Sequence, residues 1–163
     1  MAMPSEVEGR QSRALRAIVL GTLAVGALDA IDAVVFFGLR GVKPARIFQG
    51  IASGLLGRAS FSGGAATVVL GVALHFFIAF SIVSVYALAS RRLPALTRRP
   101  VVFGILYGLA VYAVMNRIVI PLSALTPPAP SVPRLVNGLL IHAFGVGLPS
   151  ALAARAGIQE KRS

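Results

Sequence analysis

The sequence contains no cysteine and only five acidic residues among its 163. The absence of cysteine excludes disulfides, thiolate metal sites and thiol nucleophiles together. The scarcity of acidic residues leaves 16 lysines and arginines largely unopposed, with a net charge of +11. Most of the remainder is apolar, since 56% of the residues are hydrophobic and the mean hydropathy is +0.83. This composition is typical of a protein that lies in a lipid bilayer.

Four long apolar windows define the expected fold. Each holds about 20 or more mainly apolar residues, roughly the length that a helix needs to cross about 30 Å of hydrocarbon. We therefore expect an all-α membrane protein with four transmembrane helices in a single domain over residues 12–156. A polar tail (1–11) and a basic tail (157–163) flank this domain, and the four windows are residues 16–39, 65–90, 101–122 and 133–154.

The positions of the basic residues distinguish two explanations of the net charge, which are nucleic-acid binding and membrane topology. A basic surface is typical of nucleic-acid binding, but here the basic residues gather at the ends of the apolar windows. Ten lie on the side of the two termini, namely Arg10, Arg13, Arg16, Arg91, Arg92, Arg98, Arg99, Arg155, Lys161 and Arg162. Five lie on the other side, namely Arg40, Lys43, Arg46, Arg58 and Arg134. The positive-inside rule then predicts cytoplasmic termini. The expected partners are the lipid bilayer and its anionic headgroups, with no nucleic acid.

A short helix is expected between the first and second windows. Pro44 suits a first helical turn, and apolar residues recur at helical spacing over residues 47–56. A second face carries Arg46, Gln49 and Ser53 beside small residues. Such a helix would lie in the membrane interface or enter the membrane as a re-entrant element. Two roles stay open for it, a packed connector and a lid over the bundle.

Six strongly polar residues stand inside the apolar windows. An aspartate or arginine at the centre of a membrane helix costs about 2.5–3.5 kcal/mol, so two aspartates and one arginine facing lipid would cost roughly 8–10 kcal/mol. We therefore expect these residues to form a buried polar layer between the helices, as intramembrane ionisable groups generally do. Arg117 is the expected ion-pair partner of Asp29 or Asp32. The layer consists of Asp29, Asp32, His75, Asn116, Arg117 and His142.

Small residues in the same windows favour close helix packing. Gly71 and Gly138 each precede a histidine by one helical turn, and Gly104 with Gly108 forms a G-x-x-x-G pattern. Glycine at such positions lets the backbone of a neighbouring helix approach closely.

Three functions are open for the polar layer. The favoured interpretation is a structural or accessory membrane subunit in which the layer fixes helix register, with a membrane-protein partner or a homo-oligomer. The second is a small-solute or proton pathway with Asp29 and Asp32 as its titrating centre. The third is a metal or a haem held by His75 and His142. The third has little support, because H-x-x-x-H and H-E-x-x-H spacings are absent, and no cofactor is expected.

No catalytic constellation is evident in the sequence. A nucleophilic serine needs a base within hydrogen-bonding reach, and neither histidine is close in sequence to Ser53 or Ser81. We therefore do not expect an enzyme.

Three segments together carry a resemblance to a known family. They are HFFIAFSIVSVYALASRRLP (75–94), GILYGLAVYAVMNRIVIPLSALTPP (104–128) and NGLLIHAFGVGLP (137–149). The combination of His75, Pro121 and His142 within these segments resembles the YagU-like family of bacterial inner-membrane proteins, which carries a domain of unknown function. The resemblance implies a multi-pass protein of the bacterial cytoplasmic membrane without an established activity, and it implies no catalytic residues.

Overall fold

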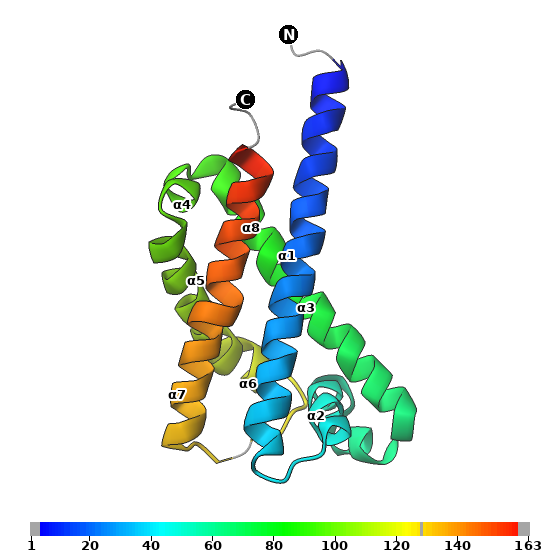
Figure 1. Ribbon diagram of the computed structural model, residues 1–163. Helices are drawn as coiled ribbons and strands as arrows, with labels where there is room; N and C mark the ends of the chain where they lie inside the picture. Colours follow the sequence, from blue (N-terminus) through cyan, green and yellow to red (C-terminus); the bar gives the residue numbers. More distant parts are fainter. Residues whose placement is uncertain (1–3, 128, 160–163) are drawn as a thin grey trace.

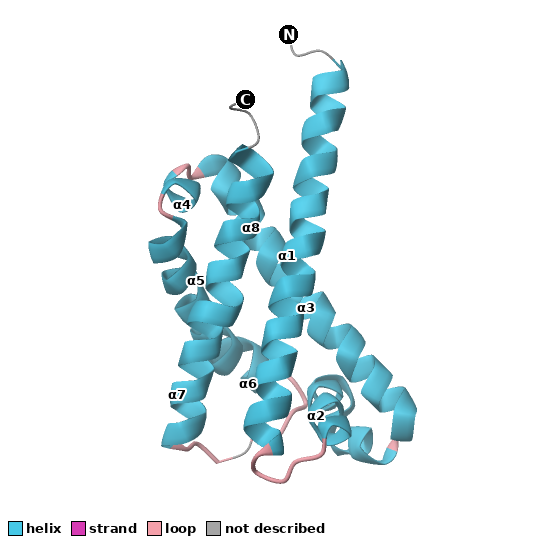
Figure 2. Ribbon diagram, viewed as in Figure 1, coloured by secondary structure: helices cyan, strands magenta, loops and turns pink. Residues whose placement is uncertain are grey.

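The computed structural model describes residues 4–127 and 129–159, and nearly all of these residues are helical (Figures 1 and 2). No strand occurs within these ranges. The elements in chain order are α1 (Pro4–Gly38), α2 (Pro44–Leu56), η1 (Gly57–Ser62), α3 (Gly64–Arg92), α4 (Ala95–Arg98), α5 (Pro100–Val114), η2 (Met115–Val119), α6 (Ile120–Leu122), α7 (Val132–Leu140), η3 (Ile141–Gly147) and α8 (Leu148–Gln159). The η1 segment is a 3₁₀ helix, and η2 and η3 are π-helical.

The short elements join into four long apolar helices. The stretches long and apolar enough to cross a membrane are Ser12–Gly38, Gly64–Arg92, Pro100–Leu122 and Val132–Gly157. The four predicted apolar windows are thereby confirmed as long helices. In Figure 1 the two termini and α4 lie at one end of the bundle and α2 lies at the other, and these ends are named the termini end and the α2 end.

The predicted tails are partly helical. Helix α1 begins at Pro4, so residues 4–11 continue the first long helix without a break. Helix α8 continues to Gln159, while residues 1–3 and 160–163 lie outside the described part of the chain. Pro44 and Pro100 each stand in the first turn of a helix, where the missing N–H of proline leaves no hydrogen bond unmade.

The third and fourth long helices are in backbone contact. A Cβ atom built on Gly108 would overlap with the carbonyl oxygen of His142, and one on Gly147 would overlap with the carbonyl oxygen of Gly104. Glycine is required at these positions because any side chain would push the two helices apart. The predicted G-x-x-x-G pattern is therefore a close helix contact between α5 and η3.

Small and β-branched side chains fill the bundle towards the termini end. Val25, Val83, Val111 and Val146 come from the four long helices and pack in one buried cluster. The hydroxyl of Tyr107 donates a hydrogen bond of 2.7 Å to the carbonyl oxygen of Ile82 beside this cluster. Close packing of this kind gains dispersion energy.

Helix α2 turns its polar positions inward. The side chains of Gln49 and Ser53 are 7% and 4% exposed, whereas Leu55 is 65% exposed. The amide Nε2 of Gln49 donates to the carbonyl oxygen of Gly64 at 3.3 Å and to Oγ1 of Thr67 at 3.4 Å. A short helix is present at the predicted place in the chain, and Gln49 anchors it to the start of α3. Its location at the membrane interface stays a prediction.

Arg46 differs from the other two polar residues of α2. Its side chain is exposed and lies over the ring of Phe61, with Cζ 4.9 Å from the ring centroid. Its Nη1 also donates to the carbonyl oxygen of Phe61 at 3.3 Å. The three residues expected on one polar face of α2 therefore lie in two different surroundings, because Gln49 and Ser53 are buried and Arg46 is exposed.

Candidate functional site

The two aspartates of α1 contact different helices. Asp29 faces His75 of α3, and its Oδ2 lies 3.8 Å from Nδ1 of that imidazole. Asp32 accepts a hydrogen bond of 2.7 Å from the side-chain amide of Asn137 on α7. Because the carboxylates are three residues apart on one face of α1, this face joins the first long helix to the second and the fourth.

His75 is held in a defined orientation by the backbone of α1. Its Nε2 lies 2.8 Å from the carbonyl oxygen of Gly26, and a carbonyl can only accept, so Nε2 carries the hydrogen. The Nδ1 atom therefore faces Asp29. The side chain of His75 is 9% exposed and that of Asp29 is 32% exposed. His75 is thus held by a backbone hydrogen bond and is buried, whereas the carboxylate of Asp29 is partly exposed.

The other three polar residues of the layer, Asn116, Arg117 and His142, stand on π-helical turns. Asn116 lies in η2 and donates to the carbonyl oxygen of Tyr112 at 2.9 Å. His142 lies in η3, where its Nδ1 donates to the carbonyl oxygen of Gly138 at 2.9 Å. The His142 ring packs edge-on against the Tyr112 ring with centroids 5.3 Å apart. π-Helical turns insert an extra residue into a helix and often occur at functional sites.

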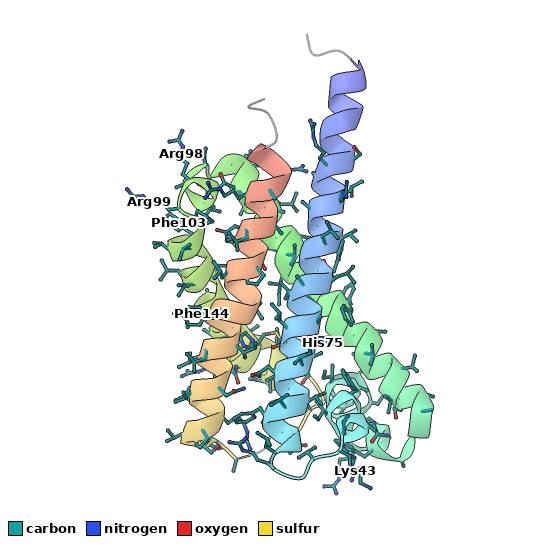
Figure 3. The ribbon with its side chains drawn as sticks, in the orientation of Figure 1. Lys43, His75, Arg98, Arg99, Phe103 and Phe144 are labelled. Carbon is teal, nitrogen blue, oxygen red and sulfur yellow. The ribbon has the colours of Figure 1, made fainter. Side chains whose placement is uncertain are left out.

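A cavity of about 290 Å³ lies where these groups meet. We name it the Asp29 cavity. Its polar lining comes from Asp29, His75, Asn116, Ser123 and His142, and its apolar lining comes from Val25, Ile51, Gly54, Ile78, Ala79, Ile82, Met115, Val119, Ile120, Leu125 and Val146. All four long helices, α2 and the segment after α6 contribute to this lining. In Figure 3, His75 lies in the half of the bundle nearer to α2.

The cavity brings together part of the predicted polar layer. Asp29 lies within electrostatic range of His75, His142 and Asp32. Asp32 does not line the cavity and is bound by Asn137 instead. Four of the six predicted residues therefore surround one space, and they come from all four long helices.

The prediction that Arg117 is buried and pairs with an aspartate is wrong. Arg117 is exposed on η2, and within the described part of the chain it forms no ion pair with Asp29 or Asp32. Both carboxylates already have partners in other helices, and the π-helical turn directs this side chain outward. An arginine near a helix end can extend its charge towards the headgroups. Asn116 is also exposed as a residue, although it lines the cavity.

Two polar contacts were missed by reasoning from the sequence. Asn137 binds Asp32, and Thr67 links Gln49 to the carbonyl oxygen of Ser60 through a hydrogen bond of 2.7 Å. The signal for Asn137 was an amide in the first turns of the fourth window, opposite the end of the first window. Polar amides that meet across membrane helices commonly hydrogen-bond.

Among the described residues, no group of three His, Cys, Asp or Glu side chains is placed to hold a metal ion. Coordination through Nε2 of His75 would also break its contact with Gly26.

No protein-family model, curated protein or solved structure matches this chain. The fold and the site define a helical bundle with four long apolar helices and a mainly apolar cavity that a few polar side chains line.

Proposed function

We propose that this chain is a multi-pass membrane protein that binds one small solute in the Asp29 cavity, as the binding step of transport. The single observation that carries the proposal is the cavity of about 290 Å³, which is lined by Asp29, His75, Asn116 and His142 from all four long helices. Ligand sites are typically apolar cavities with a few convergent polar groups, and they are commonly found between the helices of bundles.

Exposed apolar side chains support the membrane location. Large hydrophobic residues are exposed along every long helix, which would leave extensive apolar surface in contact with water in a soluble monomer. Examples are Leu20, Ile31, Val69, Phe77, Leu106, Val114, Leu140 and Leu152. The inward-facing Gln49 and Ser53 fit a helix α2 that enters the apolar layer.

The distribution of basic residues supports an orientation. Figure 3 labels Arg98 and Arg99 at the termini end and Lys43 at the α2 end. The larger number of basic residues at the termini end favours cytoplasmic termini by the positive-inside rule. Location in the bacterial cytoplasmic membrane follows from the resemblance to the YagU-like family, and this assignment stays a prediction.

The size of the cavity favours solute binding over a purely structural role. A polar layer that only fixed helix register would be close-packed, because protein interiors contain few voids larger than one water molecule. A volume of about 290 Å³ is much larger than the space that one water molecule needs. The alternative is a structural or accessory subunit, the interpretation that the sequence alone favours, and the experiment below tests it.

Helix α2 is the proposed gate of the cavity. On one side of the cavity, its lining residues Val25 and Val146 pack into the buried valine cluster. Towards the α2 end the lining consists of Ile51, Gly54 and the segment after α6. The backbone N–H of Ala124 donates to the carbonyl oxygen of Gly54 at 2.9 Å, which ties α2 to that segment. A solute would enter when this contact opens.

The test compares two glycines of the same helix. A Cβ atom on Gly54 would meet Ser123 at 3.8 Å on the cavity wall, whereas one on Gly50 would meet nothing within 4 Å. Gly54→Leu therefore fills the cavity, and Gly50→Leu makes the same change outside it. Purified protein in detergent is heated with butylamine, butanol or butanoate, since a ligand of the folded state raises the melting temperature.

We expect at least one probe to stabilise the parent and Gly50→Leu but not Gly54→Leu. Equal shifts of the melting temperature in the two variants with all three probes would contradict solute binding and favour the accessory-subunit interpretation.

A further inference from the structure

The Asp29 and His75 pair presents two hydrogen-bond acceptors to each other. Because Nε2 of His75 donates to the Gly26 carbonyl, Nδ1 of the neutral imidazole has only a lone pair. That lone pair faces Oδ2 of Asp29 across 3.8 Å. An ionised carboxylate also only accepts. Two acceptors in this arrangement repel each other unless a donor is supplied.

One proton satisfies the pair. It can reside on Nδ1, which makes His75 an imidazolium facing a carboxylate, or on Asp29, which makes a carboxylic acid facing a neutral imidazole. Either arrangement places a single hydrogen between the two groups. The distance of 3.8 Å is longer than the usual 2.7–3.2 Å of such a bond, so the space is wider than one proton requires.

An ammonium group satisfies the same two acceptors. A protonated primary amine has three N–H donors on one nitrogen, as a lysine side chain does. One N–H can donate to Oδ2 of Asp29 and another to Nδ1 of His75. Both residues line the cavity, so the ammonium can reach them from that side. The apolar lining residues then surround the hydrocarbon part of the amine.

The charges around the pair favour a cation. From α1, Asp32 adds a second carboxylate, although Asn137 already binds it. From the fourth long helix, His142 is the ionisable group that faces Asp29. From η2 the polar lining residue is the uncharged Asn116, while Arg117 is exposed. Helix α2 lines the cavity only with Ile51 and Gly54. No arginine or lysine lines the cavity within the described residues.

We propose that the Asp29 cavity binds a small primary amine in exchange for one proton. The inference rests on the proposed function and names its substrate class. The ammonium form enters from solution, and the proton held between Asp29 and His75 leaves to solution. No covalent bond to carbon or nitrogen changes, and the net charge of the site is the same before and after the exchange.

The exchange predicts a specific dependence on pH. While the pair is protonated, the apparent affinity for the amine rises about tenfold per pH unit, because one proton must leave for each amine that binds. Once the pair has lost its proton, the affinity no longer changes with pH and no proton is released. Primary amines remain charged throughout, since an alkylammonium group resembles lysine with a pKa of about 10.4.

The experiment is calorimetric titration of the detergent-purified full chain with butylamine, in two buffers of different ionisation enthalpy. We expect about one proton released per amine at the pH values where affinity rises. Tetramethylammonium carries the charge but has no N–H donor, so it should bind at least about tenfold more weakly. Asp29→Asn should weaken butylamine binding about 10- to 100-fold and abolish proton release. Asp32→Asn is the comparison variant: Asp32 does not line the cavity, so this change should weaken binding by less than Asp29→Asn and should retain proton release.

A measurement on the parent protein tests the exchange even if the Asp29→Asn variant does not fold. The ¹⁵N resonances of the His75 ring report the protonation of Nδ1 directly, and butylamine should leave Nδ1 as an unprotonated acceptor. Amine binding without proton release, equal binding of tetramethylammonium, or equal loss in Asp32→Asn would overturn the exchange. If butanol or butanoate occupies the cavity instead, the proposed function stands and this inference fails. If no probe binds, both fail.

Discussion

The two ends of the bundle use opposite ways of holding helices together. At the termini end, glycine, alanine and valine allow the helices to touch, as at Gly108 and Val83. At the α2 end, the helices separate around a cavity and contact each other through polar groups such as Asp29 and His75. Close packing gives a rigid half, and a partly polar interior gives a half that can rearrange. The comparison teaches that close backbone contacts hold one end of the bundle together, whereas polar side chains around a cavity join the helices at the other.

The largest effect is expected from a side chain at the close contact. Gly108→Leu should lower the free energy of unfolding by about 3 kcal/mol or more, because the new side chain meets the backbone of His142, which cannot move aside. The measurement is unfolding of the protein in mixed detergent micelles with increasing dodecyl sulfate. Gly38→Leu, where a Cβ atom meets nothing within 4 Å, is the control and should change little. Similar losses in both variants would break the distinction between the two ends.

An intermediate effect is expected from the hydrogen bond between α1 and α7. Asn137→Ala removes the donor to Asp32 and should cost about 1 kcal/mol, the size typical of side-chain hydrogen bonds between membrane helices. The neighbouring Val136 is an exposed residue, so Val136→Ala is the control. The same unfolding titration measures both variants. A loss as large as that of Gly108→Leu would mean that the polar end is as tightly held as the packed end.

The smallest effect is expected from Arg117. Because this side chain is exposed and forms no ion pair with either aspartate, Arg117→Gln should change the free energy of unfolding by no more than about 0.5 kcal/mol. Loss of one member of a buried ion pair typically costs about 3–5 kcal/mol. A loss of that size in the unfolding titration would restore the predicted pairing of Arg117 with Asp29 or Asp32.

The long helices and their close contacts could be predicted from the sequence because they depend on local patterns. Apolar length predicts the four helices, and the spacing of Gly104 and Gly108 predicts a face that another backbone can approach. Residue depth also predicted that Asp29, His75 and His142 would meet. The depth of a residue depends on its position along its apolar window, and this position can be read directly from the sequence.

The direction in which each polar side chain points could not be predicted. The π-helical turns at η2 and η3 each add a residue to a turn, which rotates the following side chains away from the positions that a regular helix would give them. A regular helix would therefore place Arg117 in the interior. Asn137 lies before η3, and its contact with Asp32 was missed because apolar windows do not show which side chains face each other. An amphipathic period likewise predicts two faces of α2 but not which of them meets the bundle. Gln49 faces inward because Thr67 and the carbonyl oxygen of Gly64 accept its hydrogen bonds there, while Ser53 is buried and donates to Gly50 of its own helix.

The most direct test of the account asks whether water reaches the interior of the bundle near His75. The natural absence of cysteine allows single cysteines to be introduced at two adjacent positions of α3. Ile78 lines the cavity, and Phe77 is 65% exposed on the outer surface at nearly the same depth. The account predicts that a small hydrophilic thiol reagent modifies Ile78→Cys in membranes, that butylamine slows this reaction, and that Phe77→Cys stays unmodified. Modification of Phe77→Cys alone, or of neither position, would contradict a solute-accessible cavity between the helices.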